Sequence, residues 1–199
     1  MRALLACCLL LSLAACHTLA PAPSPTTTPI VPWIERRAAL QAIDAFQFNG
    51  QLAAATATEG FSASLRWQQH GASSDLLLRA PLGVGGARIV LADGALRITA
   101  SDGTQLEADA AHAELVRLLG FEPPLASLRY WLLGTPDPHE PGAVETLDDS
   151  QRLARLQQGD WRIDYGEYMQ SGERTLPRRI AMQRGALRLK LRVSNWQQP

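Results

Sequence analysis

The chain has 199 residues and a formal net charge of zero, with 19 lysines and arginines against 19 aspartates and glutamates. The charges are dispersed along the sequence, so composition predicts neither a nucleic-acid partner nor a polybasic patch for anionic lipid. All three cysteines lie within the first sixteen residues, which leaves the rest of the chain without a disulfide, a thiolate metal ligand or a cysteine nucleophile. The length suits a single domain with a sizeable core.

The first sixteen residues predict export and a lipid anchor. Arg2 precedes an apolar run that is too short to cross a bilayer of about 30 Å, as in a secretory signal. The run closes on Leu13-Ala14-Ala15-Cys16, the pattern of a bacterial lipobox. We expect residues 1–15 to be removed and Cys16 to be acylated, which anchors a protein firmly once two or more acyl chains are attached. A soluble secretory signal with a chance cysteine is the alternative.

Residues 16–32 are predicted to form the acylated cysteine and a tether, and residues 33–199 a single domain. The tether is rich in proline and small polar residues and has no apolar periodicity. Such a segment stays extended at about 3 Å per residue, so it could hold a domain some tens of Å from a membrane.

The domain begins with a predicted helix over residues 33–43, with Pro32 just before it. Period-two alternation then predicts antiparallel strands, separated by turns at Gly71, Gly94 and Gly103. The clearest strand faces are Phe46, Phe48, Gly50 and Leu52; Phe61, Ala63, Leu65 and Trp67; Leu76 and Leu78; and Leu96 and Ile98.

A helical pair interrupts the strands. The first helix has Asp109 as its expected N-cap, and the second follows Pro123-Pro124 and ends at Gly134. Strands then resume to the end of the chain. The pattern predicts a mainly β, α+β fold of about ten or eleven antiparallel strands, with the helices across the concave side of the sheet.

A curled sheet covered by helices either encloses an apolar hollow or is filled by its own side chains. The candidates for cavity lining are Trp67, Leu78, Trp131, Trp161 and Tyr165. Alternating aromatic residues are more often simply core, so the sequence leaves both readings open. A slip of one residue in register would turn each side chain to the other face.

The glycine-rich segment after Arg79 is expected to protrude as a loop with Pro81, Leu82 and Gly83 at its tip. An exposed leucine there would contact a membrane or a partner. Alternatively, Leu82 folds back over the end of the sheet.

No arrangement of residues calls for catalysis. The four histidines show no metal-ligand spacing, and no serine stands in a nucleophile motif. Asp148-Asp149 is typical of a solvated turn. We therefore predict a protein that is not an enzyme and needs no cofactor or metal.

The sequence resembles the LolB family of outer-membrane lipoprotein receptors in the Lol lipoprotein-sorting pathway. The resemblance covers nearly the whole mature domain and depends on the order and spacing of several short motifs. They are the lipobox, Phe48-Asn49-Gly50-Gln51-Leu52-Ala53, Ser64-Leu65-Arg66-Trp67, Pro81-Leu82-Gly83, Pro124-Leu125 with Leu128, Trp131-Leu132 and Gly134, Trp161 with Ile163 and Tyr165, Leu176-Pro177, and Asn195-Trp196. Gln51 replaces the arginine usual in the family, and the tether is long.

The resemblance implies an open half-barrel whose hollow accepts the acyl chains of a lipoprotein delivered by the periplasmic carrier LolA. It implies transfer without ATP, insertion into the outer membrane with the help of Leu82, and a domain that faces the periplasm. His17 fits, because an aspartate after the acylated cysteine commonly retains lipoproteins in the inner membrane. A monomer is expected. The alternatives are a lipid-anchored docking module with a filled core and, less favoured, an envelope hydrolase.

Overall fold

The computed structural model describes residues 31–81, 85–119 and 123–197. The predicted sites at Cys16, Leu82 and Gly83 lie outside these residues, as do the signal and most of the tether. Pro81, at the start of the predicted loop, is exposed.

Three helices and eleven strands make up the described chain. The helices are α1 (Trp33–Gln41), α2 (Ala108–Leu119) and α3 (Leu125–Leu133). The strands are β1 (Ala45–Ala55), β2 (Gly60–His70), β3 (Ser73–Arg79), β4 (Gly86–Ala92), β5 (Ala95–Ala100), β6 (Gln105–Glu107), β7 (Val144–Leu147), β8 (Leu153–Gln158), β9 (Trp161–Ser171), β10 (Arg174–Arg184) and β11 (Leu187–Gln197). Helix α2 begins at Ala108, so the expected N-cap at Asp109 was wrong and that residue lies in the first turn.

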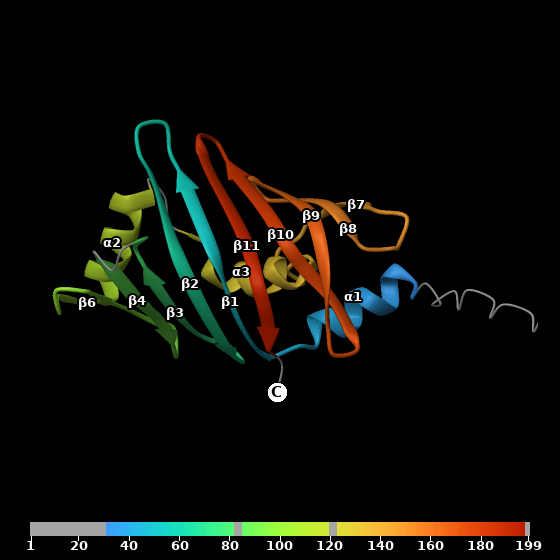
Figure 1. The fold of residues 1–199 in the computed structure, drawn as a ribbon, viewed down its shortest axis with the longest axis horizontal. Coiled ribbons are helices and arrows are strands. Elements are labelled where there is room, and N and C mark those ends of the chain that lie inside the picture. Colours follow the sequence, from blue (N-terminus) through green and yellow to red (C-terminus); the bar gives the residue numbers. More distant parts are fainter. Residues whose placement is uncertain (1–30, 82–84, 120–122, 198–199) are drawn as a thin grey trace, which may run out of the picture.

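All eleven strands belong to one antiparallel sheet in the order β6-β5-β4-β3-β2-β1-β11-β10-β9-β8-β7. Two meanders, β1 to β6 and β7 to β11, meet where β1 pairs with β11. The outermost strands β6 and β7 do not pair with each other in the part of the chain described, so the sheet is open (Figure 1). The predicted fold class and strand number are confirmed.

The seam between the meanders depends on a glycine. A bulge interrupts the β1–β11 register between Asn49 and Gly50. A Cβ atom at Gly50 would lie 2.6 Å from the carbonyl oxygen of Arg192, closer than any side chain tolerates. Glycine therefore lets β1 approach β11 closely enough to join the two meanders.

The helices cover the concave face of the sheet, and α3 crosses it behind β1, β11 and β10 (Figure 1). Helix α3 ends where the sequence predicted, at Gly134, which has a φ of 80°. A side chain there would also approach Pro177 Cγ of β10 to 2.9 Å. The C-terminal end of α3 is thus held directly against the sheet.

The buried residues form two separate clusters. The larger contains most of the aromatic side chains, including Phe48, Trp131 and Trp161. The smaller consists of four residues of β5 and α2, namely Leu96, Ile98, Ala111 and Leu115. None of the helices described is long and apolar enough to cross a membrane.

Candidate functional site

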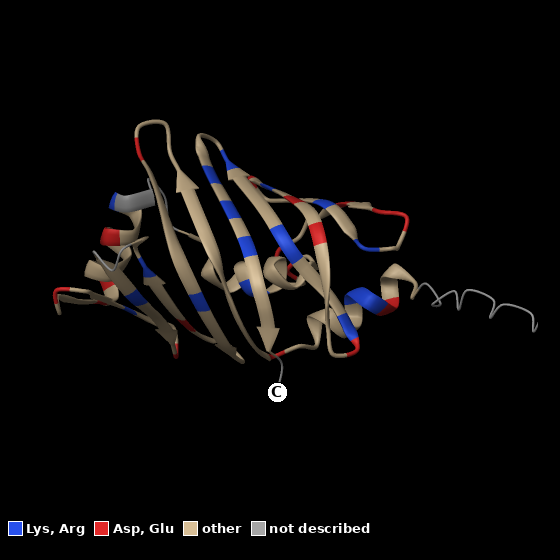
Figure 2. Cartoon of the chain, viewed as in Figure 1, with Lys and Arg blue, Asp and Glu red and all other residues tan. Residues whose placement is uncertain are grey.

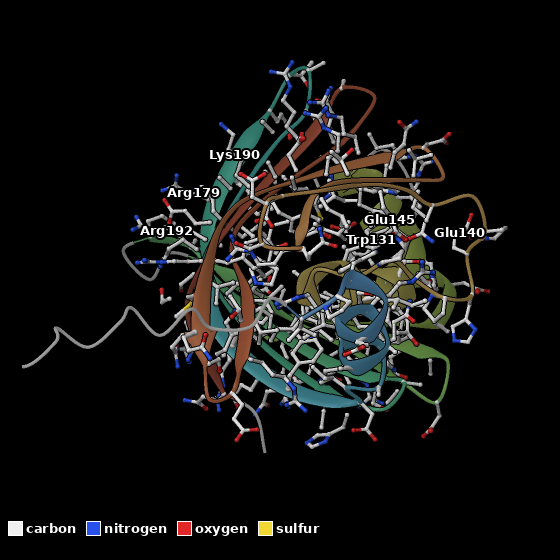
Figure 3. All side chains as sticks on the ribbon, turned by 90° about the vertical axis from the view of Figure 1, so that its right-hand side faces the viewer. Trp131, Glu140, Glu145, Arg179, Lys190 and Arg192 are labelled. Carbon is white, nitrogen blue, oxygen red and sulfur yellow. The ribbon has the colours of Figure 1, made fainter. Side chains whose placement is uncertain are left out.

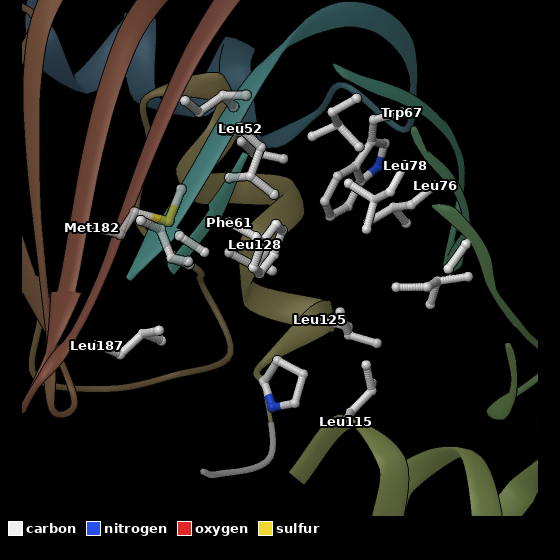
Figure 4. A pocket seen from close by; sticks show the side chains of 18 of the residues that line it. Leu52, Phe61, Trp67, Leu76, Leu78, Leu115, Leu125, Leu128, Met182 and Leu187 are labelled. Carbon is white, nitrogen blue, oxygen red and sulfur yellow. The ribbon is translucent and has the colours of Figure 1, made fainter. Parts of the chain in front are cut away.

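A cavity of about 300 Å³ lies between the sheet and helices α2 and α3 (Figure 4). Its volume is at the lower end of the range for small-molecule sites, about 300–1,000 Å³. Its walls come from strands β1 to β5, from α2 and α3, and from β10 and β11. The lining residues are Leu52, Ala54, Thr56, Glu59, Gly60, Phe61, Leu65, Trp67, Leu76, Leu78, Ala87, Ile89, Ile98, Leu115, Pro123, Leu125, Leu128, Leu132, Met182, Leu187, Leu189 and Leu191.

The polar part of this lining is confined to one end. Thr56 and Glu59 both lie in the turn between β1 and β2, and Glu59 is exposed. Phe61, next to this turn, is 50% exposed although it also lines the cavity. Leu65 and Trp67, farther along β2, also line the cavity and are buried. The cavity therefore reaches the surface near the β1–β2 turn and is apolar inside.

Two of the predicted lining residues, Trp67 and Leu78, line this cavity. The indole nitrogen of Trp67 donates to Gln69 Oε1 at 3.0 Å, and Ser74 donates to the same oxygen at 2.7 Å. This buried polar group satisfies the N–H of Trp67, so its ring presents only carbon to the hollow. Leu78 of β3 lies on the same face of the sheet as Trp67.

The other three candidates, Trp131, Trp161 and Tyr165, are not among the lining residues and lie in the larger core cluster. The rings of Trp131 and Trp161 pack with centroids 5.7 Å apart. The hydroxyl of Tyr165 donates to the carbonyl oxygen of Trp131 at 2.9 Å. Burial raises the pKa of the Tyr165 phenol well above its ordinary value. These aromatic residues fill the half of the molecule beside the cavity.

Helix α3 separates the filled half from the hollow half. Its C-terminal end is fixed by Trp131, whose Nε1 donates to Gln158 Oε1 at 2.8 Å. Leu125 and Leu128, toward its N-terminal end, face the cavity, and Leu132 near its C-terminal end also lines it. The sequence showed the leucine spacing of this helix but did not indicate that this face meets an open space, so these residues were not among the predicted lining.

The C-terminal strands supply a wall that the sequence prediction also missed. Met182, Leu187, Leu189 and Leu191 of β10 and β11 line the cavity. Their alternation was a usable signal, since it marks one face of each strand. What was missing was the long-range pairing of β1 with β11, which places that face beside Leu52.

The described residues offer no evident chemistry. No group of three or more histidines, cysteines, aspartates or glutamates lies close enough together there to hold a metal ion. The carboxylate of Asp148 accepts from Arg152 Nε at 2.8 Å within the turn between β7 and β8. What the site offers is an apolar space with an opening.

The fold and the site together define a class of protein: an open antiparallel half-barrel that encloses an apolar cavity beneath its helices. Residues 44–196 match the family model described as Outer membrane lipoprotein LolB. The outer-membrane lipoprotein LolB of Nitrosococcus oceani is 36% identical over 175 residues, which cover 88% of this chain and 87% of the relative. That of Stutzerimonas stutzeri is 32% identical over 200 residues, covering 99% and 96%. The chain belongs to the LolB family of outer-membrane lipoproteins, and it is not an enzyme.

Solved structures confirm the fold. A LolA superfamily protein from Nitrosomonas europaea matches with a TM-score of 0.56 and 13% identity, over 84% of this chain and 92% of that one. A putative outer-membrane lipoprotein-sorting protein domain from Vibrio parahaemolyticus matches with a TM-score of 0.53 and 12% identity, over 83% and 90%.

Proposed function

We propose that the protein is the outer-membrane receptor that takes lipoproteins from the periplasmic carrier LolA and inserts them into the outer membrane. The observation that carries this proposal is the apolar cavity of about 300 Å³, which opens beside the β1–β2 turn. A filled concave face, which the docking-module alternative requires, would not leave this space. Acyl chains are the apolar part of a lipoprotein, and a wall of leucines suits them.

The transfer step needs no ATP in this proposal. Burying an acyl chain stabilises it by about 0.8 kcal/mol for each CH₂ group, and this holds in either protein's cavity. A difference of a few CH₂ groups in contact would therefore drive a chain from carrier to receptor. Acylation of Cys16 would hold the receptor at the membrane facing the periplasm, and Leu82 would assist the final insertion. The receptor acts as a monomer.

Transfer of a radiolabelled lipoprotein from purified LolA tests the proposal directly. The receptor is made as its mature chain with Cys16→Ala, so that it remains in solution, and the mixture is separated by gel filtration. Label that moves with the receptor supports the proposal. Label that stays with a competent carrier refutes it.

Neighbouring leucines of β3 provide a matched pair of variants for this assay. Leu78 lines the cavity, whereas Leu77 alternates to the other face of the same strand. Leu78→Gln places an amide in the apolar wall, which lowers acyl-chain affinity because the amide lacks partners there. We expect at least tenfold weaker uptake, and near-normal uptake for Leu77→Gln. Equal uptake by the two variants would show that the cavity does not hold the cargo.

A further inference from the structure

The outer face of β11 carries a row of three cations, Arg188, Lys190 and Arg192, which we call the basic stripe. All three are exposed, while Leu187 and Leu191 alternate with them and point into the molecule. Residues two apart on a strand are about 7 Å apart, so the row is evenly spaced. Figure 2 shows it as a blue line along β11. Composition had predicted dispersed charge, and for this strand that prediction was wrong.

The basic stripe differs from several other arginines on this face of the sheet because it is unpaired. Arg88 pairs with a carboxylate of the neighbouring strand, as do Arg97 and Arg155, at distances of 2.5–2.6 Å. Within the described part of the chain, the three stripe residues have no carboxylate partner.

The strands on either side leave this charge uncompensated. Lys190 faces Ala181 on β10 and Ala53 on β1, and both neighbours are neutral. Arg192 faces a further cation, Arg179, whose partner Glu167 lies on β9. The first strand on this side to carry acidic residues is therefore β9, whose backbone lies about 10 Å from the row, and its Glu167 is already paired with Arg179. Like charges placed side by side in a sheet are destabilising, so this arrangement favours an external anion.

We propose that the basic stripe docks on the phosphate-bearing lipid headgroups of the membrane to which the protein is anchored. The proposal rests on membership of an outer-membrane lipoprotein family, which puts an anionic surface within reach. It does not depend on the cavity, which lies on the other face of the sheet. A tether with the composition of residues 16–32, if extended at about 3 Å per residue as the sequence predicts, would let the domain present its outer face to the bilayer.

The composition of the surface favours lipid over a protein partner. Protein interfaces depend on buried anchors, most often aromatic side chains. The large hydrophobic residues exposed in the described chain are Val31, Ile34, Phe61, Val116 and Val144, none of which lies in β10 or β11. A headgroup layer needs only charge, at about a fivefold gain in binding for each lysine or arginine near the surface.

The opposite side of the domain carries acidic residues, so docking should orient it. Figure 3 shows Lys190 and Arg192 on one side of the sheet and Glu140 and Glu145 on the other. Glu145 is engaged by Arg37 at 2.8 Å, whereas Glu140 is exposed. In the docked state, Ser194, which is exposed on β11 next to Arg192, lies at the headgroups and Glu140 points away.

The test uses the full acylated protein in vesicles that contain a lipid with a nitroxide headgroup. Because no native cysteine follows Cys16, Ser194→Cys or Glu140→Cys introduces a single free thiol for a fluorophore. In equimolar phosphatidylcholine and phosphatidylglycerol, we expect quenching at residue 194 and little at residue 140. Quenching at 194 should fall in phosphatidylcholine alone. It should also fall in about 1 M salt, where the Debye length is about 3 Å.

A triple variant and its control separate this stripe from net charge. Changing all three stripe residues to glutamine should reduce the ratio of docked to undocked protein about 100-fold. The control changes Arg88, Arg97 and Arg155 to glutamine; it loses the same charge more than a Debye length away and should stay within about twofold. Equal quenching at residues 194 and 140, or equal effects of the two triple variants, overturns the proposal. An absence of quenching at residue 194 also overturns it, and would indicate that the basic stripe binds an acidic protein instead. Lipoprotein uptake should be unchanged throughout, which separates this test from that of the cavity.

Discussion

Replacing Gln158 with leucine should destabilise the fold strongly, although leucine is similar in size and apolar. The Gln158 side chain is 1% exposed and makes four hydrogen bonds. Its Oε1 accepts from Trp131 Nε1 at 2.8 Å and from the backbone N–H of Asp137 at 3.0 Å. Its Nε2 donates to the backbone carbonyl oxygens of Asp137 at 2.8 Å and of Glu140. The amide therefore ties α3 and the segment after it to β8.

The size of the loss in stability follows from the hydrogen-bonding groups that leucine would leave without a partner. Glu140 is exposed, so its carbonyl oxygen can bond to water instead. The Trp131 indole N–H and both backbone groups of Asp137 stay buried without a partner. Each such orphan costs about 1–3 kcal/mol, and the added apolar burial offsets part of the sum. We expect a loss of about 4 kcal/mol in the free energy of unfolding.

Urea unfolding measures this loss, with Gln157→Leu as the control. Gln157 is the preceding residue of β8 and is exposed, so its replacement should change stability by less than about 0.5 kcal/mol. For a domain of this size, a loss of about 4 kcal/mol also lowers Tm by about 8–16 °C. A Gln158→Leu variant within about 1 kcal/mol of the parent would show that the amide network does not hold α3 in place.

Two further predictions concern the same end of α3. Gly134→Ala should lower the free energy of unfolding, measured with urea, by about 2–3 kcal/mol, because a φ of 80° strains any side chain and the Cβ would meet Pro177. The control Gly172→Ala, with a φ of 57° and open space around it, should lower it by about 1 kcal/mol. Equal losses for the two variants would show that the contact with Pro177 does not matter. Burial raises the pKa of Tyr165, so its folded state resists ionisation and the unfolded state loses the proton first. The effect of Tyr165 on stability should thus be constant below about pH 10, and above it stability should fall. Urea midpoints taken from about pH 9 upward should fall less steeply for Tyr165→Phe, and unchanged steepness would contradict the reasoning.

The strands could be predicted because alternation is a local property of the chain. Alternation placed Phe46 and Phe48 on one face of a strand and Leu65 and Trp67 on one face of the next, and all four are buried. The same local pattern sets which way Leu78 points, once β3 is recognised as a strand. The end of α3 at Gly134 was predictable for a similar reason, because the left-handed conformation that ends a helix is a property of a single residue, most often glycine.

Packing density could not be predicted, because it depends on which distant faces meet. Trp131, Trp161 and Tyr165 point inward as Trp67 does, yet they surround one another and fill their half of the molecule. Nothing in the spacing of an aromatic residue says whether its neighbours across the sheet are large or small. The basic stripe was not predicted for a related reason, because in the sequence its cations alternate with leucines that face the cavity.

The cavity follows from how the two meanders divide the side chains between them. The β8–β10 side supplies Trp161, Tyr165 and the amide of Gln158, which fix one end of α3 by rings and hydrogen bonds. The β1–β5 side faces the other end mainly with leucine, isoleucine and alanine, which make no such directed contacts. On that side the polar contacts of α3 come from Arg129, which donates to the backbone carbonyl oxygens of Gly71 and Ile43. In the part of the chain described, the apolar wall of β1 to β5 itself offers the helix no polar partner, so a space stays open between them. Helix α3 is thus fixed by polar contacts on both sides of the cavity rather than by contacts inside it, and strengthening the hydrogen bonds at its C-terminal end should not close the cavity.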